Sequence, residues 1–398
     1  MRKDYSLISI LLFFIQPFLA FLIACTDLTK RANGITFVLF YGLFGYCHTF
    51  KDIRADGYRK MLEFMDTDKT SLIDILSQYM EGDIMDIYQS IIFNWIISFT
   101  NNPHIMMMIV GIIGGIFCLK LLKRILAEYS ESFNIYICCL LILISLPISP
   151  VHMGGIRGFT ALSVFAYSAI KLLIDKKRAW IIPIFFTPLI HFGYLLVVGY
   201  ILIILILPYR HNLFFWPAII ACIASLFLDT QSWVTVAENA TLYVDNDAIT
   251  QRTNHYTDID TGTEFNRSLT TKALNIQNKI LAWYVVILLI YLRRNWEELN
   301  HSQYSYKIYN YALSFTFLGF GLLSFSVVGQ RYLYLCWIML GLFLLVLYNK
   351  NRNSTIRLLI AIIPLVFLGH ILWVIYNSYV VTGTTLYYQS LPQLTLLR

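Results

Sequence analysis

The sequence predicts an all-α fold, a polytopic transmembrane helical bundle of about 11–13 spans. Only 13% of the 398 residues are charged and 58% are hydrophobic, whereas soluble domains carry about 25% charged residues. The mean hydropathy is +0.64. The apolar residues form continuous blocks near spanning length, without the alternation of barrel strands. These observations exclude a soluble globular protein and indicate one integral membrane domain over residues 1–398.

The apolar blocks define the expected helices in order. They occupy residues 5–25, 34–50, 104–122, 133–150, 156–174, 179–207, 213–229, 274–292, 306–328, 331–348 and 356–376. The block 179–207 is too long for one span and contains Pro183 and Pro188, so we expect two segments, or one span and a half-helix. The stretch 84–100 is short and carries Asp86, so it either lies at the interface or dips part-way.

Basic residues between the blocks predict the orientation. They gather in residues 120–124, 175–178, 208–211, 291–296 and 349–357. These segments should face the cytoplasm, so the net charge of +7 is a topology signal and we expect no nucleic-acid partner. Arg157 and Arg331 then fall on the outer face, where the topology does not require them.

Two polar regions interrupt the apolar pattern. Residues 51–83 show helical periodicity and predict amphipathic helices that lie on the bilayer surface. The charges do not decide on which side this loop and the N-terminus lie. Residues 230–273 form the longest polar stretch, which we expect to be an external, periplasmic loop.

The motifs of nucleotide and metal chemistry are missing from the sequence. It contains no P-loop, no G-x-G-x-x-G, no H-E-x-x-H and no G-x-S-x-G. The seven cysteines lie in or beside apolar blocks and form no C-x-x-C pair. We therefore expect no cofactor and no metal, and an enzyme of this kind would use an activated, lipid-bound substrate.

Arg157 is the first candidate site residue. It follows Gly154 and Gly155 at the start of an apolar helix, where glycines allow close approach and helix amides favour an anion. Arg331, followed by Tyr332 in "GQRYLYL", repeats this arrangement. Two outer arginines at helix starts suggest a lipid diphosphate, because guanidinium groups bind phosphate in a bidentate manner. The alternative is a pair of interfacial arginines that extend toward lipid headgroups.

Two histidines are further candidates. His191 lies deep in apolar sequence, and it is either a packing residue or a site residue that carries a proton or contacts a sugar. His152, between apolar blocks, is a weaker substrate-binding candidate.

The polar loops supply the remaining candidates. Asp56, with Arg54 and Tyr58, could form a polar cluster in which Asp56 acts as a base or orients a sugar hydroxyl; the alternative is a solvated acid. Arg252 and Tyr256 suit carbohydrate contacts or an ordinary solvated loop.

Four segments resemble the EpsG-type family of bacterial polysaccharide polymerases, which includes O-antigen (Wzy-like) polymerases. They read "IRADGYRKMLEF", "IIFNWIISFTNNPHIMMMIVGIIG", "GGIRGFTALSVFAYSAIKLL" and "IIPIFFTPLIHFGYLLV". They cover residues 45–200, and "GQRYLYL" extends the likeness. Gly158 stands where the family often has glutamine, and Ala55–Asp56 lacks the glycine of the family's G-T-D.

The resemblance implies a mechanism and a location. The growing glycan would pass from undecaprenyl diphosphate to the next lipid-linked repeat unit, at the periplasmic face of the bacterial inner membrane. Asp56, Arg157 and His191 would be the catalytic residues. The resemblance favours the interfacial position of 84–100 and leaves a chain-length regulator protein open as a second partner.

Other classes compete with this reading. A flippase would transport the same lipid-linked unit, but transporters often have two matching halves, and no such symmetry is evident. A glycan ligase or acyltransferase could bind a diphosphate through the same arginines. A non-catalytic membrane scaffold is a third alternative, and the outer arginines, aspartate and histidine argue against it.

Overall fold

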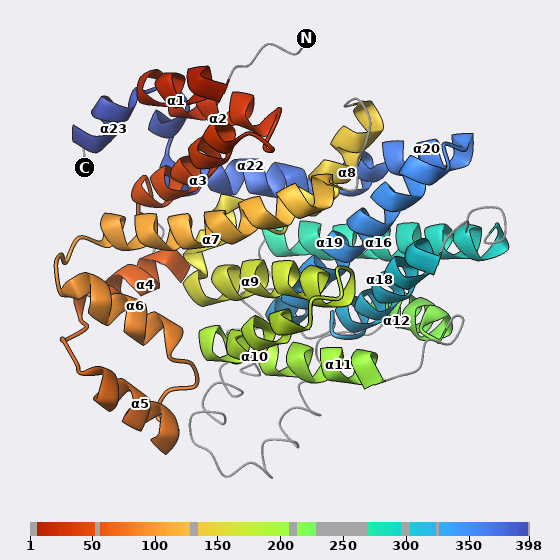
Figure 1. The fold of residues 1–398 in the computed structure, drawn as a ribbon, viewed down its shortest axis with the longest axis horizontal. Coiled ribbons are helices and arrows are strands. Elements are labelled where there is room, and N and C mark those ends of the chain that lie inside the picture. Colours follow the sequence, from red (N-terminus) through yellow and green to blue (C-terminus); the bar gives the residue numbers. More distant parts are fainter. Residues whose placement is uncertain are drawn as a thin grey trace.

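The computed structural model describes residues 6–51, 56–127, 134–206, 213–227, 269–295, 303–323 and 326–396. Every regular element in these ranges is a helix (Figure 1). The predicted fold class, a polytopic helical membrane protein, is confirmed.

The apolar blocks fold as helices that range from four to 26 residues in length. They are α1 (Ser6–Ile15), α2 (Pro17–Cys25), α3 (Arg31–Tyr46), α7 (Pro103–Leu126), α8 (Ile135–Ser145), α9 (Ile156–Leu173), α10 (Ile181–Ile190), α11 (Tyr194–Ile206), α12 (Phe215–Phe227), α16 (Leu269–Arg294), α18 (Gln303–Gly321), α19 (Ser326–Lys350), α20 (Ser354–Ala361), α21 (Ile363–Val366) and α22 (Leu368–Thr382). The shorter elements are α4 (Asp56–Met65), α5 (Leu72–Glu81), α6 (Tyr88–Ile97), α23 (Leu391–Leu396) and the 3-10 helices η1 (Pro150–Gly154), η2 (Arg178–Trp180) and η3 (Thr385–Tyr387).

Fewer helices reach spanning length than the sequence predicts. Among the described residues, five helices are long and apolar enough to cross a membrane, or six if the pair Ser354–Val366 and Leu368–Thr382, bent by 42°, is one span. The sequence predicts 11–13 spans. The number of spanning helices in the described residues is lower because several apolar blocks fold as helices of 10–17 residues. The block 179–207 divides into α10 and α11 around His191, as its prolines predict.

The first apolar block is not one span. The chain breaks at Gln16 (φ −148°, ψ 89°), since Pro17 has no N–H to continue the helix. α2 then packs against α3, with Phe21 stacked on Phe40 at 4.2 Å between ring centroids. A ten-residue helix is about 15 Å long, roughly half of a hydrocarbon core of about 30 Å.

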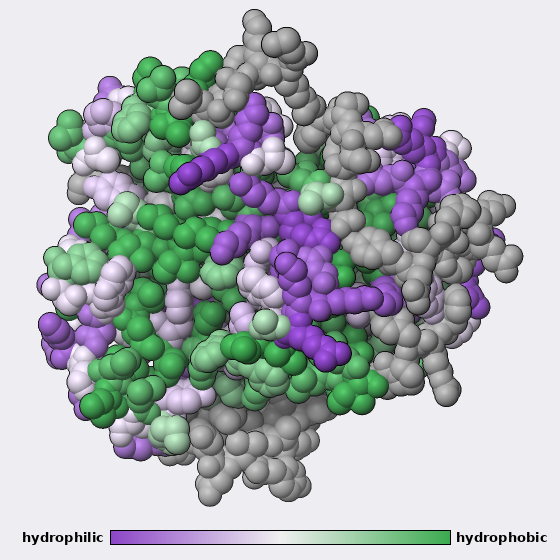
Figure 2. All heavy atoms as spheres, in the orientation of Figure 1, coloured by the Kyte–Doolittle hydropathy of each residue, from purple (hydrophilic) through white to green (hydrophobic). Residues whose placement is uncertain are grey.

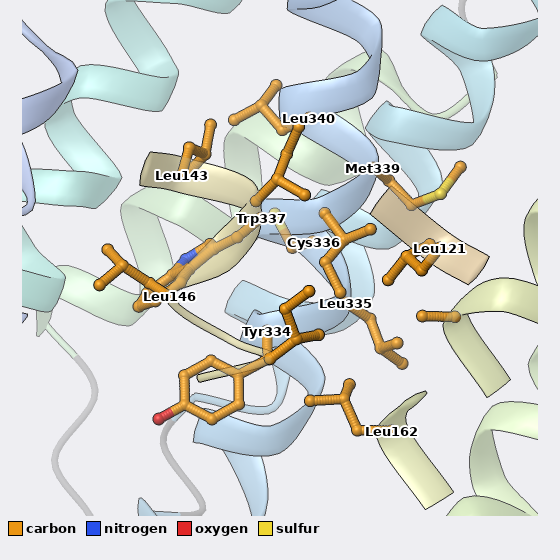
Figure 3. Packing of buried hydrophobic residues seen from close by; sticks show 14 of the residues in the cluster. Leu121, Leu143, Leu146, Leu162, Tyr334, Leu335, Cys336, Trp337, Met339 and Leu340 are labelled. Atoms are coloured by element: carbon orange, nitrogen blue, oxygen red, sulfur yellow. The ribbon is translucent and has the colours of Figure 1, made fainter. Parts of the chain in front are cut away.

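α19 is the centre of the bundle. Of its apolar window, 89% is buried inside the protein, compared with 50% for α7. Figure 3 shows its side chains among Leu121 of α7, Leu143 of α8 and Leu162 of α9. A helix surrounded in this way holds its N-terminal residues, which include Arg331, in a fixed position.

α3 and α7 pack in antiparallel fashion through small residues. A Cβ atom at Gly45 would lie 2.2 Å from the Met107 carbonyl oxygen, and one at Gly34 would lie 3.1 Å from a methyl carbon of Leu119. Glycine allows this approach, as it does at many membrane helix contacts. The C-terminal end of α3 therefore lies beside the start of α7, away from the basic end of α7.

The antiparallel packing of α3 and α7 indicates on which side of the membrane the loop 51–83 lies. With the basic end of α7 cytoplasmic, as the sequence predicts, α4 and α5 lie toward the outer face. They stand with α6 at the end of the molecule where α7 begins, on the left of Figure 1. α6 has only ten residues, which agrees with an interfacial position for 84–100. Figure 2 shows hydrophilic side chains gathered over the opposite ends of α7 and α9, between hydrophobic surfaces.

Candidate active site at the helix ends

The candidate site forms where α9 and α19 begin and α10 ends. Arg157 is the second residue of α9, after Gly155 at the N-cap position. A Cβ atom at Gly154 would lie 3.4 Å from the backbone nitrogen of Gly57 at the start of α4. Gly154 and Gly155 thus place the start of α4 within ordinary contact distance of the arginine-bearing helix.

Arg157 forms an ion pair with Asp86, a polar residue of the stretch 84–100 that is not among the predicted site residues. Nη1 of Arg157 lies 3.0 Å and 3.2 Å from the two carboxylate oxygens. The side chain of Asp86 is 2% exposed and that of Arg157 is 22% exposed. A buried carboxylate needs such a partner, so Asp86 fixes the guanidinium at the edge of the protein.

Backbone and side-chain contacts hold Asp86 in place. The N–H of Ile87 donates to the carbonyl of Leu189 near the end of α10 (3.0 Å). The hydroxyl of Tyr88 lies 3.2 Å from Oγ1 of Thr160 on α9. The segment before α6 is therefore fastened to both helices that carry candidate residues.

His191, Arg331 and Tyr332 form a second cluster. Nη1 of Arg331 contacts Nε2 of His191, and the hydroxyl of Tyr332 donates to the carbonyl of Gly193 (2.6 Å). The N–H of Gly193 lies 3.1 Å from Nδ1 of His191. His191 is 9% exposed, so the ring links the end of α10 to the start of α19.

The two ring nitrogens of His191 both face N–H donors. A neutral imidazole accepts at only one nitrogen. If Nδ1 accepts from Gly193, Nε2 carries the proton, and the N–H groups of His191 Nε2 and Arg331 Nη1 then face each other. An anion that accepts hydrogen bonds from both groups would stabilise this arrangement.

Gly158 brings the two arginine clusters together. A Cβ atom there would lie 3.6 Å from Cδ2 of His191 and 3.9 Å from Nε of Arg331. The residue that follows Arg157 is thus in contact range of the second cluster. Its lack of a side chain leaves space at this point, where the family often has glutamine.

The structure places the other predicted residues differently. Asp56 is the first residue of α4 and pairs with Arg59, and its side chain is 50% exposed. Its Oδ2 would lie 3.8 Å from a Cβ atom at Gly155, so it borders the site. Tyr58 packs partly buried against the core.

His152 does not join Arg157. Its Nε2 lies 3.1 Å from the carbonyl oxygen of Leu146, and its ring packs against Tyr334 and Trp373 at 5.0 and 5.5 Å between centroids. The η1 turn directs this side chain toward α19 and α22, so His152 has a packing environment here. Arg54, Arg252 and Tyr256 lie outside the described residues, as does most of the loop 230–273.

An acid and a base on α4 lie close to Arg157 and were not predicted. Glu63 accepts from Lys60 (2.6 and 2.8 Å) and from Gln89 Nε2. Burial lowers the pKa of Lys60, and the nearby Arg157 charge lowers it further against the opposing effect of Glu63. For Glu63, burial acts to raise the pKa, but the hydrogen bonds from Lys60 and Gln89 and the charge of Arg157 outweigh it and lower the pKa.

The sequence carried a signal for these contacts. Asp86 and Gln89 are polar residues in the otherwise apolar stretch 84–100, and such residues usually face a partner. No group of three or more His, Cys, Asp or Glu residues within the described ranges could hold a metal ion.

These features define a polytopic helical membrane protein with an arginine-rich site at the ends of its helices. The model of the EpsG family matches residues 34–390, nearly the whole chain. The chain therefore belongs to the EpsG family, a Wzy-like family of polysaccharide polymerases. No curated protein and no solved structure matches it.

Proposed function

We propose that this protein transfers a growing glycan from undecaprenyl diphosphate to the next lipid-linked repeat unit, at the periplasmic face of the bacterial inner membrane. It would be a glycosyltransferase of the polymerase type. Membership of the family supports polysaccharide polymerisation in general.

The observation that carries the proposal is the pair of arginines beside Gly158. Among the described residues, each guanidinium has only Nη1 engaged, by Asp86 in one case and by His191 in the other. Within the part of the chain that the structure describes, no hydrogen bond or ion pair engages Nε or Nη2 of either arginine. Two partly committed guanidinium groups suit the several oxygens of a diphosphate.

The chemistry of the leaving group explains the use of arginine. When the bond between the anomeric carbon and the diphosphate oxygen breaks, negative charge develops on the diphosphate. Fixed donors that face this charge lower the barrier, typically by about 10²- to 10³-fold in rate for each donor group. The N-terminal end of α9 adds its positive dipole end.

A groove offers space for the lipid chain. It has a volume of about 750 Å³ and lies between α2 and α3 on one side and α8 and α22 on the other. Phe40, Phe44, Ile142 and Val374 are among its mainly apolar lining residues. Ser149 and Pro150 are among its lining residues, and they come directly before the rest of η1 and Arg157 in the chain. An apolar groove of this kind suits a polyprenyl chain whose diphosphate is held by the arginines.

The test is a gel of lipid-linked and surface glycan from cells that lack the gene. The cells are complemented with the wild type, Arg157→Ala, Arg157→Lys or Arg331→Ala, and the amount of protein in the membrane is measured. We expect a ladder of repeats with the wild type and a single surface repeat unit with each variant. A normal chain length in both Arg157 variants would contradict the role of this arginine.

The same gel separates the competing functions. Without a flippase, repeat units would remain at the cytoplasmic face and even the single unit would be missing from the surface. Without a ligase, a ladder would persist on the carrier lipid and would not reach the surface. Either pattern in cells without the gene would overturn the polymerase proposal.

A further inference from the structure

A polar cleft lies beside the arginine site, between α4, α5 and α6. Its volume is about 700 Å³. Below it, Phe64 and Phe93 pack edge to face at 5.2 Å between centroids, and Ile75 is buried. The amide of Asn94 donates to the carbonyl of Thr70, which ties α6 to the turn before α5. These contacts hold the three short helices around the cleft.

The lining of the cleft suits sugar hydroxyls. Its charged and amide side chains are Arg59, Glu63, Asp66, Asp68, Gln78 and Gln89. Carboxylates accept hydrogen bonds from hydroxyls, and amides both donate and accept. Three carboxylates against one guanidinium disfavour an anionic ligand. The cleft therefore fits a neutral or amino sugar better than an acidic sugar or a phosphate.

Glu63 connects this cleft to Arg157. Its carboxylate accepts from Gln89, which lies three residues after Asp86, the ion-pair partner of Arg157. The side chain of Glu63 is 47% exposed, so it remains accessible from the cleft.

We propose that the cleft binds the terminal sugar of the acceptor repeat unit and that Glu63 is the residue that removes the proton from its attacking hydroxyl. The inference rests on the proposed polymerase function. The acceptor oxygen forms a bond to the anomeric carbon of the donor, and its proton passes to the Glu63 carboxylate. The bond from that carbon to the diphosphate oxygen breaks, and the diphosphate leaves with the electron pair beside Arg157.

Geometry favours Glu63 over Asp56 for this role. Asp56 is paired with Arg59 and does not line the cleft. Glu63 lines it, and its lowered pKa keeps it ionised, as a base must be at neutral pH. Lys60, on the other side of Glu63, is positioned to hold the carboxylate in place.

The test uses the purified full-length protein in vesicles. The substrate is the lipid-linked repeat unit that accumulates in cells lacking the gene. Glu63→Gln keeps the shape of the side chain and one acceptor oxygen but cannot take a proton. We expect its rate of repeat addition to fall about 10²- to 10⁴-fold. Glu81→Gln is the matched control, because Glu81 is on α5, bonded to Ser77, and does not line the cleft.

Two further readouts separate catalysis from folding. Glu63→Gln should bind a polyprenyl diphosphate as the wild type does, since this contact belongs to the arginines. The wild type should lose activity as the pH falls and Glu63 is protonated, and the residual activity of Glu63→Gln should lack this loss. Asp68→Asn should raise the KM for the acceptor with little change in kcat.

The outcomes distinguish the two proposals. If the wild type forms no ladder from the lipid-linked unit, the polymerase proposal fails whatever Glu63 does. If the wild type forms a ladder and Glu63→Gln forms it at a rate within about threefold, less than the smallest effect of a general base, the role of Glu63 is refuted. An unchanged acceptor KM in Asp68→Asn would refute the sugar site in the cleft.

Discussion

The ion pair between Asp86 and Arg157 offers a sharp test of how the site is built. The substitution Asp86→Asn preserves the size of the side chain and one oxygen that accepts from Nη1. It removes the negative charge that offsets the guanidinium and orients it. Because Asp86 is 2% exposed and Arg157 is 22% exposed, water replaces this contact poorly.

The magnitude follows from the geometry of the pair. A hydrogen bond to a charged group contributes about 1.5–3 kcal/mol, and removal of one partner from a fully buried pair costs about 3–5 kcal/mol. The partial exposure of Arg157 places this pair near the lower range. If this energy orients Arg157 in the transition state, the rate falls roughly 10- to 100-fold, at 1.36 kcal/mol for each factor of ten.

The assay is the rate of repeat addition in vesicles, measured for Asp86→Asn, Arg157→Lys and the double variant. We expect the double variant to be little slower than Arg157→Lys alone, because both changes remove one interaction. A wild-type rate in Asp86→Asn, or effects that add fully in the double variant, would refute the claim that Asp86 positions Arg157. The amount of folded protein in the membrane is the control for each variant.

Three other changes test separate parts of the account. Gly158→Leu should push Arg331 away from His191 and abolish the ladder. Gly158→Ala should be tolerated, because its Cβ would make ordinary contacts of 3.6–3.9 Å. Equal activity of the two variants would contradict the close packing at Gly158. Ile142→Trp should fill the apolar groove and shorten the glycan. Ile287→Trp, on an exposed surface, should leave the glycan length unchanged. A normal ladder in Ile142→Trp would argue against a lipid chain in the groove. Burial acts to raise the pKa of Asp175, but hydrogen bonds from Arg124 and Lys171 lower it below its ordinary value. The stability that Asp175 provides should thus be present at neutral pH and lost as the pH falls through the lowered pKa, and thermal unfolding of Asp175→Asn should lack this loss.

The fold class followed from the sequence because the hydrophobic content alone requires a membrane environment. The break within 179–207 was also predictable, since prolines interrupt a helix. The break at Gln16 carries the same signal, Pro17 within the block 5–25. The length of this block matches one span, however, so hydropathy alone predicts a single segment. Among the described residues, fewer helices reach spanning length than the 11–13 predicted spans, because hydropathy measures which residues avoid water and does not measure where a helix ends.

The candidate site was predictable in part. The glycines before Arg157 mark the start of α9, whereas Gly329 lies inside α19, which begins at Ser326. The structure brings Arg331 against His191 and places Gly158, the neighbour of Arg157, beside it. Their partners are set by contacts between distant segments, and no local pattern pairs Asp86 with Arg157 or Glu63 with Gln89. His152 lies near Arg157 in the sequence, but its ring turns toward the aromatic side chains of α19 and α22, and its role in substrate binding stays a prediction.

The central claim is that Arg157 and Arg331 hold a lipid diphosphate, and direct binding tests it best. The measurement is the affinity of the purified protein for undecaprenyl diphosphate and for undecaprenyl monophosphate, in the wild type and in Arg157→Ala/Arg331→Ala. We predict that the wild type binds the diphosphate at least tenfold more tightly, a difference of about 1.4 kcal/mol, and that the double variant loses this preference. Equal affinities for the two lipids in the wild type, or an unchanged preference in the double variant, would contradict the account.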